Sequence, residues 1–175
     1  MIRSVLTNNS GEEFSYVSPR SLEATAPTFI FFHATGFNGQ TYWQLIEGLD
    51  QRFQGSMNFI SLDQRGHGLS TAKAEPEKLI DWSLYLRDAL EITDKLEGPL
   101  FCAGHSMGSI IAAKLSCLRQ QKVKKLIMLE PVLYGPFECF KYRFMRSIGR
   151  RNKVELVELA AKRRSKFESS SKDWF

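Results

Sequence analysis

The segment that most constrains the fold is the pentapeptide Gly104-His105-Ser106-Met107-Gly108. Before it comes an apolar run, residues 99–103, typical of a buried strand, and after it come residues 109–115, whose apolar spacing is typical of a helix. A direct turn from strand to helix strains the backbone of its central residue. The residues two positions before and after must be small, because the strand and the helix pass close together. We therefore predict that Ser106 lies at the apex of a sharp turn, with an exposed hydroxyl beside a helix N-terminus.

Other apolar segments alternate in type along the chain. The predicted strands are residues 4–7, 14–17, 28–32, 58–62, 99–103 and 125–129, and the predicted helices are residues 41–49, 81–95 and 109–115. Asp81 is the expected N-cap of the second helix and Gly98 its expected stop. Continuous apolar runs such as residues 28–32 are typical of strands buried on both faces of a parallel sheet. The alternation predicts an α/β fold with helices on both faces and a site at the carboxyl ends of the strands.

Length and composition exclude several classes of protein. The 175 residues are enough for one domain with a hydrophobic core, and no apolar run approaches the roughly 20 residues of a membrane span. Residues 1–9 lack the apolar core of a secretory signal. Cys102, Cys117 and Cys139 are odd in number and lack metal-type spacing. We expect reduced thiols, no metal and a cytoplasmic protein.

The net charge of +5 is unevenly distributed, with −4 over residues 1–118 and +9 over residues 119–175. A basic segment of this kind is compatible with nucleic acid or an anionic membrane surface. No aromatic-stacking or groove-reading motif accompanies the charges, however. We expect a solvated helical face and no nucleic-acid partner.

Three segments that follow predicted strands resemble motifs of the α/β-hydrolase superfamily. His33-Ala34-Thr35-Gly36 is similar to the family's His-Gly-x-Gly oxyanion loop, and residues 63–70, Asp-Gln-Arg-Gly-His-Gly-Leu-Ser, are similar to its D-x-R-G-H-G-x-S loop. The pentapeptide around Ser106 resembles the nucleophile elbow of esterases, lipases and carbon–carbon bond hydrolases. The resemblance covers about residues 1–135. It implies an α/β-hydrolase core there, a mostly parallel twisted sheet flanked by helices, with about six of the family's eight strands.

The resemblance also implies roles for individual residues. Ser106 would be the nucleophile, and the backbone N–H groups of Thr35 and Met107 would form the oxyanion hole. A serine here argues against haloalkane dehalogenase or epoxide hydrolase chemistry, because relatives with those activities use aspartate. Ala34 replaces the usual glycine, a mild departure in the oxyanion loop. The residues expected to line or support the site are His33, Gly36, Phe37, Gly104, His105 and Gly108.

The acid and the base of a catalytic triad are harder to place. Glu130 ends the sixth predicted strand and is the candidate acid, although a carboxylate in a Glu-Pro turn that caps the sheet edge is an equal alternative. The chain has three histidines. By family placement His33 belongs to the oxyanion loop, His67 to a structural loop, and His105 points away from the site. None lies where the family's catalytic histidine belongs, and a serine without a base is a poor nucleophile.

Residues 136–175 differ in character from the core. They contain two basic helical segments, the first with an aromatic face, and they look like the start of a cap inserted after the sixth strand. The resemblance therefore implies the N-terminal two-thirds of a hydrolase, ending inside its cap. Without a seventh strand, the outer edge of residues 125–129 would be open to self-association.

Two functions are compatible with these observations. The first is a serine hydrolase that needs no cofactor and cleaves an ester or related acyl bond of a small molecule through an acyl-Ser106 intermediate, with impaired activity in this chain. The second is a catalytically silent protein of the same fold that binds a ligand or a partner. The lack of a suitably placed histidine is the main support for the second.

Overall fold

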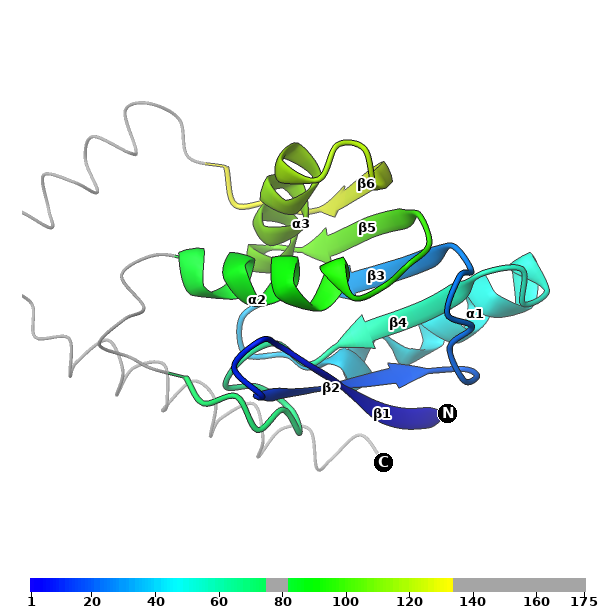
Figure 1. The fold of residues 1–175 in the computed structure, drawn as a ribbon, viewed down its shortest axis with the longest axis horizontal. Helices are drawn as coiled ribbons and strands as arrows, with labels where there is room; N and C mark the ends of the chain where they lie inside the picture. Colours follow the sequence, from blue (N-terminus) through cyan, green and yellow to red (C-terminus); the bar gives the residue numbers. More distant parts are fainter. Residues whose placement is uncertain (75–81, 134–175) are drawn as a thin grey trace, which may run out of the picture. The chain divides into compact units, whose positions relative to one another are not determined.

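The computed structural model describes residues 1–74 and 82–133, nearly all of them in one unit, Met1–Val132. This unit is a six-stranded sheet with the strand order β1-β2-β4-β3-β5-β6 (Figure 1). Its elements are β1 (Ile2–Thr7), β2 (Glu13–Ser18), β3 (Thr28–Phe32), η1 (Gly39–Tyr42), α1 (Trp43–Phe53), β4 (Asn58–Leu62), α2 (Ser83–Asp94), β5 (Leu100–His105), α3 (Met107–Leu118) and β6 (Val123–Leu129). The expected cap, residues 136–175, lies outside the described residues.

All six predicted strands are present, and the sheet is mostly parallel. The strands β4, β3, β5 and β6 run parallel to one another, while the β1–β2 and β2–β4 pairs are antiparallel. Residues of β3 and β4 are buried at every position. Burial on both faces explains why the sequences of these two strands are apolar almost throughout.

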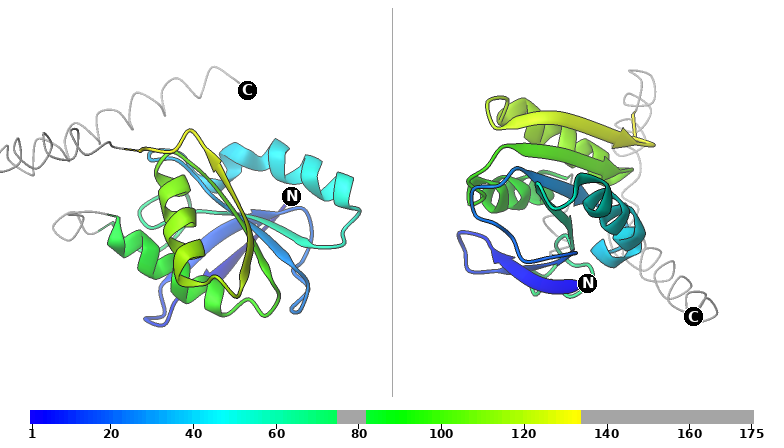
Figure 2. Two further views of the ribbon diagram at one scale, coloured as in Figure 1. Left: turned by 90° about the horizontal axis from the view of Figure 1, so that it is seen from above. Right: turned by 90° about the vertical axis from the view of Figure 1, so that its right-hand side faces the viewer.

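The helices pack on both faces of the sheet, as predicted (Figure 2). On one face α2 and α3 bury the larger hydrophobic cluster, which includes Ile92 and Ile111 together with Leu100 and Cys102 of β5. On the other face α1 covers the smaller cluster, with Ile46 against phenylalanines of β3 and β4. The strand β5 therefore contributes alternate residues to two cores.

The second helix ends within one residue of the predicted bound, but not at the predicted glycine stop. It ends at Asp94, and Lys95 is its C-cap in a right-handed conformation, so Gly98 is not its stop. Gly98 instead lies against the backbone of Ala26, where a Cβ atom would collide with a carbonyl oxygen. Asp81, the predicted N-cap, lies outside the described residues, and the observed N-cap is Trp82, which makes no side-chain capping bond.

Strand registry brings the expected site loops to one edge of the sheet. Phe32 of β3 pairs with both Leu62 of β4 and Gly104 of β5, and His105 of β5 pairs with Leu129 of β6. The residues that follow these strands therefore start at the same level. This edge is where an α/β sheet places its site.

Candidate active site

The turn around Ser106 is as sharp as the sequence predicts. The strand β5 ends at His105 and α3 begins at Met107, so Ser106 alone separates them, with φ 53° and ψ −115°. A non-glycine residue at positive φ is strained. A Cβ at Gly108 would collide with the backbone of Phe32, and one at Gly104 would collide with the backbone of Gly108. The two glycines thus allow the strand and the helix to approach as closely as the turn requires.

Neighbouring strands hold this turn in place. The Ser106 N–H donates to the carbonyl oxygen of Leu129 at 2.9 Å, and the Ser109 hydroxyl donates to the carbonyl oxygens of Gly104 and Leu129 at 2.6 and 2.9 Å. Ser106 is partly exposed. Its hydroxyl makes no hydrogen bond within residues 1–74 and 82–133, and so it remains available to a substrate or a base.

The two candidate oxyanion donors belong to residues that touch. The Thr35 hydroxyl lies 3.3 Å from the sulfur of Met107. Met107 is the first residue of α3, where backbone N–H groups have no partner within the helix and the helix dipole favours negative charge. The Thr35 N–H likewise has no acceptor among the described residues, and Thr35 is exposed. Amides without an acceptor at a helix N-terminus and in the adjoining loop are groups of the kind that can stabilise a developing oxyanion.

His33 holds the oxyanion loop and does not act as a base. Its Nε2 atom accepts the Gln64 N–H at 3.0 Å, so Nδ1 carries the proton and donates to the Ala34 carbonyl oxygen at 2.8 Å. Burial lowers the pKa of His33 to about 3, with the nearby His67 adding to the effect. A neutral imidazole with both nitrogens engaged has no capacity left to take the serine proton.

Alanine at position 34 fits the loop without strain. The non-glycine residues at positive φ in the described chain are Gln54, Ser106 and Glu130, and Ala34 is not among them. Within this loop the positive φ falls on Gly36, at 85°. The usual glycine is therefore dispensable at position 34, because Gly36 makes the turn.

The other two histidines are also engaged. His67 donates from Nδ1 to the Arg65 carbonyl oxygen at 2.8 Å and accepts the Gly36 N–H at Nε2, at 3.2 Å. His105 shares a 2.8 Å hydrogen bond with the Tyr42 hydroxyl, and its ring stacks on Phe37. This places His105 toward η1, on the α1 side of the sheet. No histidine of the chain has a described contact with Ser106 or Glu130.

Glu130 lies level with Ser106, because Leu129 pairs with His105. Its φ is 42°, a strained value, and its side chain is exposed. No described residue forms an ion pair or hydrogen bond with its carboxylate. The position suits a triad acid, but the histidine that such an acid would orient is not beside it, so the role of Glu130 stays a prediction.

Sequence reasoning missed the part played by Asp63. This carboxylate is 1% exposed and accepts the Gly39 N–H at 2.6 Å and the Leu69 N–H at 2.9 Å. Arg3 of β1 donates to it at 3.1 Å. Asp63 therefore ties the end of the oxyanion loop to the next loop. The available signal in the sequence was a strand end followed by a glycine-rich segment. Gly68 lies in this segment, and a Cβ at Gly68 would collide with the Asp63 carboxylate.

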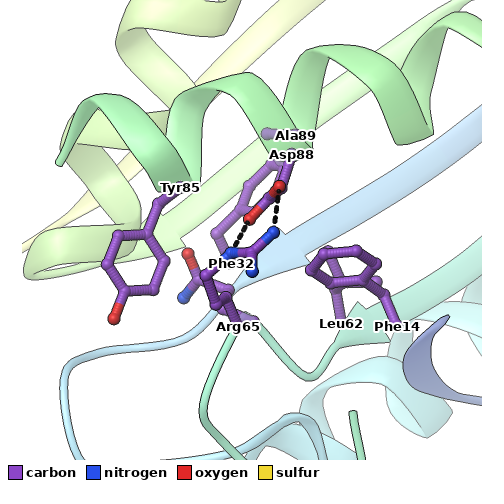
Figure 3. Close-up of a pocket in the computed structure, with 8 residues that line it drawn as sticks. Phe14, Phe32, Leu62, Arg65, Tyr85, Asp88 and Ala89 are labelled. Atoms are coloured by element: carbon purple, nitrogen blue, oxygen red, sulfur yellow. Dashed lines mark hydrogen bonds and ion pairs between the residues drawn. The ribbon is translucent and has the colours of Figure 1, made fainter. Parts of the chain in front are cut away.

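Arg65 anchors the loop of residues 63–70 to α2. Its side chain is fully buried and donates to Asp88 of α2 at 2.7 and 2.8 Å (Figure 3). It also donates to Glu12 at 2.7 Å. The paired carboxylates raise the pKa of Arg65, and the hydrogen bonds from Arg65 lower the pKa of Glu12 to about 2. The cavity here is only about 10 Å³, less than a ligand needs, so this ionic cluster is structural.

A larger cavity of about 330 Å³ lies on the α1 side, where Leu45 and Phe53 of α1 face Phe101 of β5 and Ile127 of β6. Neither Ser106 nor Thr35 lines it. The described residues contain no cluster of potential metal ligands and no helix of the length and apolarity that crossing a membrane requires.

Comparison with known proteins decides the family. The sequence model for the family described as serine aminopeptidase, S33, matches residues 24–174. The chain belongs to this family of α/β-hydrolases. Its candidate nucleophile, oxyanion loop and elbow all fall within the matched region.

Relatives and solved structures agree with this assignment. A hydrolase from Acinetobacter baylyi, (E)-2-((N-methylformamido)methylene)succinate hydrolase, is 33% identical over 59% of this chain and 37% of its own. Protein phosphatase methylesterase 1 from Debaryomyces hansenii is 30% identical over 70% of this chain and 34% of its own. The thioesterase domain from the curacin biosynthetic pathway superposes with a TM-score of 0.67, at 21% identity, over 83% of this chain and 52% of that domain. The last likeness shows the fold alone.

The matched part of the chain spans about a third of the length of these curated relatives.

Proposed function

We propose that this chain forms the nucleophile-bearing core of a cytoplasmic serine hydrolase that cleaves an ester or related acyl bond through an acyl-Ser106 intermediate. The observation that carries the proposal is the strained, partly exposed Ser106 at the N-terminus of α3, whose first residue, Met107, contacts Thr35. One relative is named as a methylesterase and another as a hydrolase of a substituted succinate, which supports hydrolysis as the reaction. The solved structures that resemble this chain support its fold and nothing more.

The geometry suggests a role for each group. The Ser106 oxygen would attack the acyl carbon as its proton passes to a general base, and the N–H groups of Met107 and Thr35 would stabilise the negative charge on the carbonyl oxygen. The bond to the leaving group then breaks as the base returns the proton to that group, and water hydrolyses the acyl-serine. Losing one such oxyanion donor typically lowers the rate by about 10²- to 10³-fold. Glu130 would orient the general base. We do not assign that base to the three histidines of this chain. His33 and His67 engage both ring nitrogens elsewhere, and His105 directs Nδ1 to the Tyr42 hydroxyl and has no described contact with Ser106.

This account predicts weak activity for the chain alone. An elbow and an oxyanion hole without a base still give about 10³- to 10⁴-fold catalysis over water in triad-deleted serine enzymes. An external base should then replace the missing one. We expect slow modification of Ser106 by a fluorophosphonate probe, with a rate that rises with added imidazole.

The experiment is a time course of labelling with peptide mass spectrometry, with Ser106→Ala as the control. The proposal holds if the adduct maps to Ser106 and its rate depends on imidazole. If no Ser106 adduct forms at any imidazole concentration, the engaged histidines favour the second function, a silent ligand- or partner-binding protein of this fold. Rapid ester turnover without imidazole would instead show that a base is already present.

A further inference from the structure

We propose that His67 is a positioning residue of the oxyanion hole: its Nε2 atom holds the Gly36 amide, which belongs to the second of the two peptide units flanking Thr35, and so helps to keep the Thr35 N–H in place. The inference rests on the proposed function, because it concerns the donor that would stabilise the oxyanion. It assigns a task to a loop, residues 63–70, that the sequence marks only as structural.

The first argument is that this loop is the main support of the oxyanion loop. Gly36 N–H donates to His67 Nε2 at 3.2 Å, and Gly39 N–H donates to Asp63 Oδ1 at 2.6 Å. Gln64 adds bonds from its backbone and its side chain to His33, at 3.0 and 2.8 Å. Residues 33–39 are therefore held from one side at their start, middle and end.

The second argument concerns the proton of His67. A carbonyl oxygen can only accept, so the contact with the Arg65 carbonyl places the proton on Nδ1 and leaves Nε2 as an acceptor. The ring is further located by His33 and Tyr85, whose ring centroids lie 4.8 and 6.3 Å away. The Arg65 side chain is itself fixed by Asp88 and Glu12. The acceptor that faces Gly36 thus has both a defined tautomer and a defined position.

The third argument links Gly36 to the donor. Thr35 lies between two peptide units. The carbonyl of the first, at Ala34, accepts from His33 Nδ1 at 2.8 Å and from the Phe37 N–H at 3.1 Å. The N–H of the second, at Gly36, is held by His67. In a planar trans peptide the N–H points opposite to the C=O, so a fixed Ala34 carbonyl fixes the Thr35 N–H. Without the second anchor, the flexible Gly36, at φ 85°, would let Thr35 drift.

Two substitutions separate the two hydrogen bonds of His67. His67→Asn keeps a side-chain N–H near the position of Nδ1, toward Arg65, but removes the acceptor for Gly36. His67→Gln keeps an acceptor near the position of Nε2. We expect His67→Asn to speed exchange of the Gly36 amide proton, measured by NMR, and to lower imidazole-assisted labelling of Ser106. A group displaced by about 1 Å can cost about 10²-fold in rate. His67→Gln should retain most of the protection of the Gly36 amide and most of the labelling rate of Ser106.

The outcomes are distinguishable. If His67→Asn leaves both Gly36 exchange and labelling unchanged, the inference is wrong. It is also wrong if the Asn and Gln variants lose labelling equally while thermal unfolding shows equal loss of stability, because the role is then merely structural. If Ser106 is never labelled but Gly36 exchange follows the predicted order, the proposed function fails while the anchoring of the loop by His67 stands.

Discussion

At the scale of single residues, the position of Ser106 is set mainly by how closely the backbone segments around it approach one another. Ser106 has room for its strained turn only because Gly104 and Gly108 leave the strand and the helix in close contact. The serine hydroxyl is then presented without a partner among the described residues. The exposure of the Ser106 hydroxyl thus depends on the absence of a Cβ atom at Gly104 and Gly108.

Gly108→Ala tests this directly. The new methyl group would meet the carbonyl oxygen of Phe32, a backbone atom in a buried strand that cannot move aside. Overpacking of this kind typically destabilises by about 1–3 kcal/mol. We expect a lower urea midpoint at constant slope. The control is Gly48→Ala in α1, where nothing lies within 4 Å, and here a gain of about 0.5–1 kcal/mol is expected. Equal effects of the two substitutions would contradict the steric account.

A second residue-scale prediction concerns pH. The hydrogen bonds from Arg65 lower the pKa of Glu12 from 4.5 to about 2. A carboxyl whose pKa is lower in the folded state stabilises the protein above its unfolded pKa, and the contribution is lost as pH falls toward the folded value. The stability gap between the native chain and Glu12→Gln should therefore close between pH 4.5 and 2.

Urea unfolding across this pH range measures the gap. Glu13→Gln is the matched control, because the neighbouring Glu13 is exposed and makes no ion pair in the described part of the chain. A gap for Glu12→Gln that stays constant with pH would show that Arg65 does not stabilise the charged form.

At the scale of elements, the strands were predicted more closely than the ends of the helices, since α1 runs to Phe53 rather than residue 49 and α3 to Leu118 rather than residue 115. The run Thr28–Phe32 is apolar because both faces are covered, and its predicted bounds match the observed ones. The predicted role of Gly98 as the stop of α2 was wrong, because this glycine is required by close contact with Ala26, a tertiary constraint that resembles a helix stop in sequence. Local pattern cannot distinguish these two uses of glycine.

The same limit applies to the site. The motif around Ser106 is local, so its turn could be predicted from spacing. The work of Asp63 and His67 depends on which loop lies beside residues 33–39, and that follows only from strand order. The sequence could place both loops at one edge of the sheet but could not show which atoms meet.

At the scale of the whole unit, β6 is the feature that most affects behaviour in solution. It pairs with β5 on one side, and no described strand pairs with its other side. Ile127 and Leu129 are 50% and 40% exposed and border the apolar cavity of about 330 Å³ beside α1. An open edge next to an exposed apolar face favours pairing with another chain.

We therefore expect the isolated chain to self-associate through β6, with an average mass in light scattering that rises with concentration. Ile127→Lys should reduce this, because a lysine at a strand edge opposes pairing and makes the adjoining face less apolar. The matched control is Val5→Lys, since Val5 is also 50% exposed but lies on β1, at the opposite edge of the sheet. Loss of association in the Val5 variant alone would assign the contact to β1. A native chain that stays monomeric at all concentrations would show that the β6 edge is protected in solution.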